Sequence, residues 1–136
     1  TAQRNVTGFN YKRLGMLTAV LEKRIGLAMG TKDIFVNLVG GLKIDDPAAD
    51  LSIISAIASS TMDKYIEKDI ILCGEVGLTG EVRSISHLNQ RITEALSLGF
   101  KKAIVPSYGM KEKLKNVDMD LYPVKNVKET FKILFQ

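Results

Sequence analysis

The chain has 136 residues and an ordinary apolar fraction, which is enough to bury the core of a single domain. No stretch approaches the roughly 18 uninterrupted apolar residues of a membrane span, and one cysteine with one histidine excludes an intrachain disulfide, a cysteine-based zinc site and a histidine-rich metal site. The net charge is +4, and the whole excess lies in residues 101–136, which hold eight lysines against four acidic side chains. This mildly basic balance permits nucleic acid as a partner without requiring it.

The chain begins at Thr1 rather than Met and shows no signal-peptide pattern. We therefore expect one domain, residues 1–136, cut from a longer protein, with the reducing cytoplasm as its compartment. Cys73 lies in an apolar run, where we expect a buried and inert thiol.

The first half of the chain predicts two helices with a strand between them. Apolar residues at three- and four-residue spacing predict a helix over 11–29, with Gly30 as its C-terminal cap. The run 34–39 predicts a strand, and a Gly-Gly break follows it. Asp46 is a good N-cap with proline after it, so it predicts a helix over 47–62. This second helix is apolar or small on all sides, and we expect it to be buried.

The second half of the chain predicts short strands that alternate with helices. Apolar periodicity, glycines and a proline after a short apolar run set the boundaries. The predicted elements are a strand over 70–74, a hairpin over 76–82 with its turn at Thr79-Gly80, a helix over 87–98 closed by Gly99, a strand over 102–105, a short helix near 109–115, a strand over 119–124 and a helix over 126–135. No linker interrupts this order, so the expected fold class is α/β, a two-layer α+β arrangement with a mixed sheet and packed helices.

Two segments together outline the framework of a serine–lysine hydrolase. Such an enzyme needs a serine at a helix start, where backbone N–H groups bind the oxyanion, and a nearby lysine as base. The segments are Asp-Asp-Pro-Ala-Ala-Asp over 45–50 and the hairpin over 74–83, which leads into Ile-Ser-His-Leu-Asn over 85–89. Here and over 98–106 the chain resembles the Lon-type ATP-dependent proteases, with Ala48 at the serine position and Asn89 at the lysine position. Since neither side chain can perform that chemistry, the resemblance implies no catalytic residue and no peptidase activity.

The chain also resembles the C-terminal Lon-like domains of the RadA (Sms) family of bacterial DNA repair proteins. The resemblance rests on residues 17–24, 36–41, 45–51 and 74–83, and its most specific part is Pro-Ala-Ala-Asp at 47–50. It implies the Lon proteolytic-domain fold and a role in DNA repair and recombination. It further implies a parent DNA-dependent ATPase that forms homo-hexameric rings on single-stranded or branched DNA. ATP, magnesium and zinc would belong to parent domains absent from this chain, which itself would hold no cofactor and no metal.

The acidic residues Asp45, Asp46 and Asp50 allow two interpretations. They are either a metal cluster or a helix N-terminus, where carboxylates cap N–H groups and interact favourably with the helix dipole. We favour the helix N-terminus. Lys43 is the nearest lysine in sequence, but a general-base role for it lacks a partner nucleophile.

Two further sets of polar residues invite a catalytic interpretation. Adjacent residues at a helix start rarely face one another, so we expect His87 to be an exposed cap-region residue rather than the partner of Ser86 in a dyad. The serines of the second helix are expected to be small packing residues rather than nucleophiles: Ser52, Ser55, Ser59 and Ser60.

The basic residues are the remaining candidates for a functional site. Phosphate binding needs long cationic side chains on one accessible face, and arginine offers a bidentate fork. Few aromatic residues lie among them, so we expect sequence-independent contact with the DNA backbone rather than base stacking. The lysines from 111 to 132 rank below the arginines because acids are interspersed among them. The candidate DNA-binding residues are Lys12, Arg13, Lys23, Arg24, Arg83, Arg91, Lys101 and Lys102.

We therefore expect a catalytically inactive Lon-like domain that contacts DNA and supports ring assembly. The alternative is a pure oligomerisation scaffold without DNA contact, which an exposed apolar patch would favour. A residual peptidase is the third and least favoured hypothesis.

Overall fold

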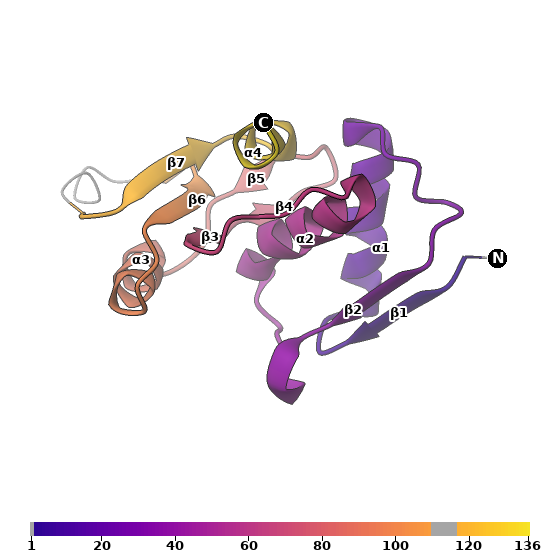
Figure 1. Cartoon of the computed structure of the whole chain (residues 1–136), viewed down its shortest axis with the longest axis horizontal. Helices are drawn as coiled ribbons and strands as arrows, with labels where there is room; N and C mark the ends of the chain where they lie inside the picture. The colour runs from indigo at the N-terminus through magenta and orange to yellow at the C-terminus, as the bar shows by residue number, and fades with distance from the viewer. Residues whose placement is uncertain (1, 110–116) are drawn as a thin grey trace.

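A computed structural model describes residues 2–109 and 117–136 (Figure 1). The predicted helix near 109–115 falls almost wholly outside the described residues. The elements are β1 (Arg4–Thr7), α1 (Tyr11–Val20) continued by a π-helical turn (Leu21–Ile25), β2 (Ile34–Asn37), α2 (Asp50–Met62), β3 (Ile70–Leu72), β4 (Glu75–Val76), β5 (Val82–Arg83), α3 (Leu88–Ser97), β6 (Lys102–Pro106), β7 (Asp120–Val124) and α4 (Val127–Leu134).

The described strands form three small sheets, and together they confirm a mixed α/β fold. β1 and β2 pair in parallel, β3, β6 and β7 form a parallel sheet in that order, and β4 and β5 form an antiparallel hairpin. Helix α2 lies between the two parallel sheets (Figure 1). The predicted hairpin turn is confirmed, because Gly80 adopts a left-handed φ of 84° that a side chain would strain.

The core consists of two hydrophobic clusters. The larger one joins α1, α2 and the sheets through fully buried residues such as Leu17, Ile54 and Ile104. The smaller one packs α3 on β6 and includes Ile92 and Val105. None of the helices formed by the described residues has the length and apolar character needed to cross a membrane.

Three expectations about the first half of the chain are wrong in detail. The first helix ends before Gly26, whose φ of 85° makes it the left-handed cap, rather than at Gly30. The predicted strand over 34–39 stops at Asn37, because a 3-10 turn with Gly40 at φ 79° follows. Helix α2 is not buried on all sides, since Ala56 and Ser60 are exposed.

Strand β1 has no counterpart in the sequence prediction. Its four residues, Arg-Asn-Val-Thr, contain one aliphatic side chain and give no clear alternation. The strand forms because β2 supplies a partner, with Ile34 N–H donating to the Gln3 carbonyl at 2.9 Å and Leu38 N–H donating to the Thr7 carbonyl at 3.1 Å.

Candidate functional site

Ala48 lies just before α2, beside an open hollow of about 410 Å³. The alanine is 3% exposed and sits in a 3-10 turn, Pro47–Ala49. Its backbone N–H donates to the Asp46 carboxylate at 3.0 Å, so Asp46 caps the turn as predicted. The Ala48 N–H is therefore not free to bind an oxyanion.

An ion pair closes one side of this hollow. The Arg91 guanidinium, from α3, lies 2.7 Å from the Asp46 carboxylate, and its Nε donates to the Ser86 carbonyl at 2.9 Å. The hydrogen bonds from Ala48 N–H and from Arg91 hold the pKa of Asp46 below its usual value. Among the described residues that line the hollow, α3 contributes Arg91 and not Asn89.

Within residues 2–109 and 117–136, the other polar groups considered for catalysis offer no activated nucleophile near the hollow. Cys73 is buried, as predicted, and burial raises the pKa of its thiol to about 11, so the thiol stays protonated at neutral pH. His87 is exposed at the start of α3, as predicted, and its side chain makes no capping hydrogen bond. Lys43 also lines the hollow, from the segment that precedes Asp46 in the sequence.

Asp50 lies at the N-terminus of α2, as predicted, but its carboxylate does not cap that helix. It lies in the first turn of α2, is fully buried, and accepts a bidentate pair of hydrogen bonds from Arg13, one of them from Nε at 2.9 Å. The Val76 N–H donates to the same carboxylate at 3.1 Å. This ion pair raises the pKa of Arg13 and ties α1, α2 and β4 together. The guanidinium of Arg13 is thus held by the buried carboxylate of Asp50.

The three acids near residue 48 do not come together as a cluster. Asp46 and Asp50 have the separate partners given above, and in residues 2–109 and 117–136 no three His, Cys, Asp or Glu side chains are placed to hold a metal ion. The serines of α2 are also dispersed. Ser52 and Ser59 donate to backbone carbonyls, Ser55 is buried, and Ser60 is exposed.

The eight predicted DNA-binding residues do not share one surface. Lys12 and Arg24 lie near opposite ends of the continuous first helix, about 20 Å apart at 1.5 Å per residue. Arg83 pairs with Glu81 at 2.9 Å, and Lys102 pairs with Glu67 at 3.0 Å. With Arg13 and Arg91, four of the eight pair with carboxylates, and Arg83 is exposed all the same. The other four, Lys12, Lys23, Arg24 and Lys101, are exposed and make no salt bridge among the described residues.

Lys23 and Arg24 instead adjoin lysines that the sequence analysis ranked lower. The turn of the hairpin links the two segments. The Val127 N–H at the start of α4 donates to the Gly80 carbonyl at 2.8 Å, and a Cβ placed on Gly80 would lie 3.4 Å from the Arg24 side chain. We use the name basic ridge for the exposed cations on these two adjoining segments, which are Lys23, Arg24, Lys125, Lys128 and Lys132.

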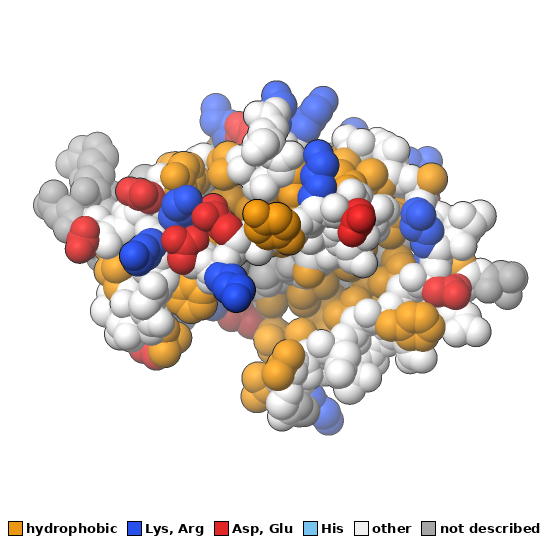
Figure 2. Space-filling model, viewed as in Figure 1, with side chains coloured by type: hydrophobic (Ala, Val, Ile, Leu, Met, Phe, Trp, Pro, Cys, Tyr) orange, Lys and Arg blue, Asp and Glu red, His pale blue; other side chains and the backbone are white. Residues whose placement is uncertain are grey.

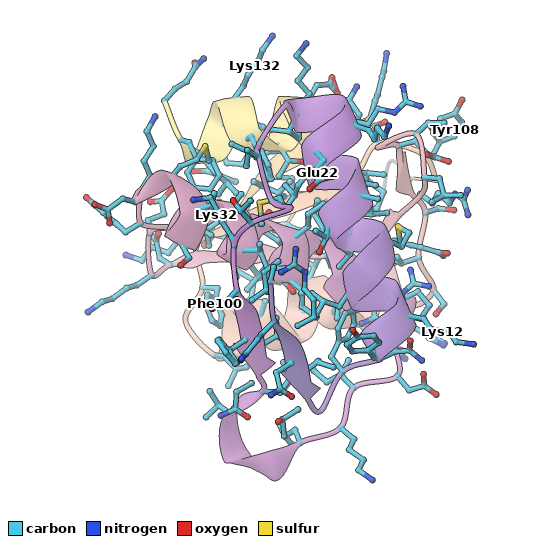
Figure 3. All side chains as sticks on the ribbon, turned by 90° about the vertical axis from the view of Figure 1, so that its right-hand side faces the viewer. Lys12, Glu22, Lys32, Phe100, Tyr108 and Lys132 are labelled. Atoms are coloured by element: carbon cyan, nitrogen blue, oxygen red, sulfur yellow. The ribbon has the colours of Figure 1, made fainter. Side chains whose placement is uncertain are left out.

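The side chains of the basic ridge are exposed to solvent. Lys and Arg side chains gather along the upper margin of the molecule, over α4 and the end of α1 (Figure 2). Lys132 lies at the top of the view, above α4, and Lys12 lies lower, beside α1 (Figure 3). Among the described residues, no salt bridge involves any of the five cations of the ridge. The spacing of Lys128 and Lys132, one helical turn apart, was the sequence signal for this surface.

Glu81 organises the hairpin turn next to the ridge. Its carboxylate accepts hydrogen bonds from the Thr79 hydroxyl and N–H and from the Arg83 guanidinium, and Gly77 leaves the space that a Cβ would take from it. These hydrogen bonds, with that of the Thr79 hydroxyl first, lower the pKa of Glu81 from 4.5 to about 2.

The lowered pKa of Glu81 predicts an acid-sensitive hairpin. A carboxylate with a depressed pKa in the folded state stabilises the protein fully above pH 4.5, and this contribution is lost as the pH falls toward about 2. We expect Glu81→Gln to lose this part of the pH dependence. Urea unfolding of the unmodified chain and of Glu81→Gln between pH 2 and 7 measures the pH dependence of the free energy of unfolding. Equal pH dependence in the two proteins would contradict the assignment.

Comparison with known proteins gives one matching family and several close relatives. Residues 18–136 match the family described as the Lon protease (S16) C-terminal proteolytic domain. The chain is 39% identical over 135 residues to the DNA repair protein RadA of Aquifex aeolicus, covering 99% of this chain and 30% of the relative. It is 42% identical over 130 residues to RadA of Bacillus subtilis, covering 96% of this chain and 28% of the relative. It is 45% identical over 104 residues to RadA of Halalkalibacterium halodurans, covering 76% and 23%. The chain therefore spans less than a third of the length of these relatives.

Proposed function

Because the chain belongs to the Lon protease (S16) C-terminal proteolytic domain family and matches RadA proteins along most of its length, we propose that it is a non-proteolytic DNA-contacting domain of a RadA-type DNA repair protein. The observation that carries the proposal is the basic ridge, whose five exposed cations make no salt bridge among the described residues. Long cationic side chains suit the phosphate backbone of DNA.

The surroundings of Ala48 support the absence of peptidase activity. The side chain has no nucleophilic atom, its N–H is capped by Asp46, and the thiol of Cys73 is protonated at neutral pH. Arg91 is held by Asp46 and is not poised as a base.

We expect no hydrolysis of casein or of short fluorogenic peptides above the rate without protein. Ala48→Ser alone should leave this unchanged, because a serine without a base remains a weak nucleophile. Release of the fluorophore over hours at pH 8 measures it. Turnover that scales with the concentration of Ala48→Ser would contradict the proposal.

In the longer protein, this domain would support homo-hexameric ring assembly and the processing of recombination intermediates in the cytoplasm. ATP hydrolysis, with its magnesium, and a zinc-binding segment would belong to other domains of that protein.

The alternative function is an oligomerisation scaffold without DNA contact. The exposed side chains of Phe35, Val39 and Leu42, which lie within eight residues of each other, favour it. Light scattering together with DNA titration separates the two functions. Assembly with no salt-sensitive DNA affinity supports the scaffold, and salt-sensitive DNA affinity supports the proposed function.

A further inference from the structure

The outer edge of β2 presents backbone groups without partners. In a parallel pair, the N–H and C=O of one residue point to one side and those of the next residue point to the other. Ile34 and Leu38 donate to β1, so the even-numbered groups of β2 face β1 and those of Phe35 and Asn37 face away. Among the described residues, no hydrogen bond satisfies the outward N–H groups of Phe35 and Asn37.

A groove runs along this edge. It has a volume of about 420 Å³ and is lined by β2 with one residue on either side of it, residues 33–38, and by one side of α2, from Ser52 to Thr61. Because neighbouring residues from both faces of the strand line it, the groove follows the edge rather than one face. The space-filling view shows this hollow, with hydrophobic side chains inside it, below α2 (Figure 2).

The dimensions of the groove suit one extended chain. The four residues of β2 span about 13 Å, and the ten residues of α2 along the groove span about 15 Å. A strand edge facing a helix across such a space is the arrangement in which a peptide adds as an extra strand. The groove shares no lining residue with the hollow beside Ala48, so it is a separate site.

The lining of the groove is complementary to an uncharged ligand. Among the described residues that form it there is no lysine or arginine, and their one charged member, Asp33, already accepts a hydrogen bond from Gln3 N–H at 2.7 Å. Ile53, Ala56 and Ile57 supply apolar surface from α2. These features disfavour a phosphate backbone and favour a peptide with small apolar or hydroxyl side chains.

A second edge of the fold shows the contrast. In β7 the Asp120 N–H donates to the Lys101 carbonyl, so Leu121 and Pro123 present their backbone groups outward. Proline has no N–H to offer, and a proline on an edge strand prevents further pairing. The edge of β2 has no such protection at Phe35 or Asn37.

We propose that this groove binds an extended, uncharged peptide segment of a partner protein, which adds to β2 as a third strand. The peptide hydrogen-bonds to the outward backbone groups of Phe35 and Asn37. Its alternate side chains contact the apolar wall of α2. This site is independent of the DNA contact proposed above, and either can fail without the other.

The test begins with a phage-displayed library of random dodecapeptides selected on the immobilised chain. Enriched peptides are synthesised with a fluorescent label, and their affinity is measured by anisotropy. Ala56→Glu places a negative charge at an exposed position of the groove wall. Ser97→Glu adds the same charge at an exposed position of α3 and serves as the matched control. Phe35→Pro removes one outward donor and keeps the ladder to β1, so it tests the site independently of Ala56→Glu.

We expect enrichment of uncharged peptides whose affinity falls at least tenfold in Ala56→Glu and in Phe35→Pro but not in Ser97→Glu. Bound peptide should slow amide hydrogen exchange at Phe35 and Asn37, whereas Ile34 and Leu38 are protected already. Three results would overturn the proposal: no enriched peptide, equal affinity in Ala56→Glu, or protection of Phe35 and Asn37 that rises with the concentration of the chain alone. The last result would assign the groove to a second copy.

Discussion

Arg13→Gln is expected to lower the free energy of unfolding by about 3 kcal/mol, the lower end of the range for breaking a buried ion pair. The change leaves the Asp50 carboxylate, which is fully buried, with a single remaining hydrogen bond from Val76 N–H. A buried charge without its partner has a desolvation penalty that one neutral donor does not offset. We choose the lower end because the Arg13 side chain itself is 32% exposed.

Urea unfolding at pH 7, followed by circular dichroism, measures this loss. Lys12→Gln is the matched control, since Lys12 is the exposed neighbour in the same helix, and it should change stability by less than about 0.5 kcal/mol. In the double variant Arg13→Met with Asp50→Leu, stability should largely return, because an apolar pair of similar size needs no charge compensation. Equal stability of Arg13→Gln and Lys12→Gln would contradict the assignment of this ion pair as a structural link.

This ion pair also determines how DNA binding can be tested. A charge reversal at Arg13 would unfold the domain and abolish binding for reasons unrelated to DNA. Arg91 has the same difficulty to a lesser degree, because it anchors α3 to Asp46. Variants on the basic ridge avoid both problems because their side chains are exposed and make no salt bridge among the described residues.

The triple variant Arg24→Glu, Lys128→Glu and Lys132→Glu is expected to weaken DNA binding about 100-fold at low salt. Each phosphate contact that is lost removes about one counterion from the salt dependence, so the slope of log affinity against log salt should fall by about two to three. The control is Lys12→Glu, Lys43→Glu and Lys101→Glu, which changes the net charge equally at exposed positions away from the ridge. Fluorescence anisotropy with a labelled single-stranded oligonucleotide measures both.

The control variant should retain most of its affinity and nearly all of its salt slope. Equal losses in the two triple variants would mean that net charge, and not the ridge, governs binding. Normal unfolding curves for both variants are required, and the exposure of all six side chains predicts them.

Local features of the fold were predictable from the sequence because they depend on neighbouring residues. The cap at Asp46, the turn at Gly80 and the end of α3 before Gly99 each follow from the conformations and hydrogen bonds available within a few residues. The first helix was extended too far because Gly26 and Gly30 offer the same signal, and only the π-helical turn determines which one acts as the cap.

Features that depend on distant residues were not predictable. Strand β1 exists only because β2, thirty residues later, pairs with it. The pairing of Arg13 with Asp50 joins residues 37 positions apart. Because of it, the predicted DNA-binding residue Arg13 binds a carboxylate of the protein itself, and Asp50 does not cap α2. The basic ridge likewise depends on α4 docking against the hairpin at Gly80, which brings the start of α4 close to the segment that carries Arg24.

The most direct test of the central claim is a salt titration of the unmodified chain with a labelled single-stranded oligonucleotide, from about 20 to 300 mM NaCl. Contact of three to five ridge cations with phosphates predicts an affinity that falls with a log–log slope of about −2 to −4. Absence of binding at the lowest salt, by a chain that unfolds cooperatively and scatters light as a defined species, would contradict the claim that this domain contacts DNA.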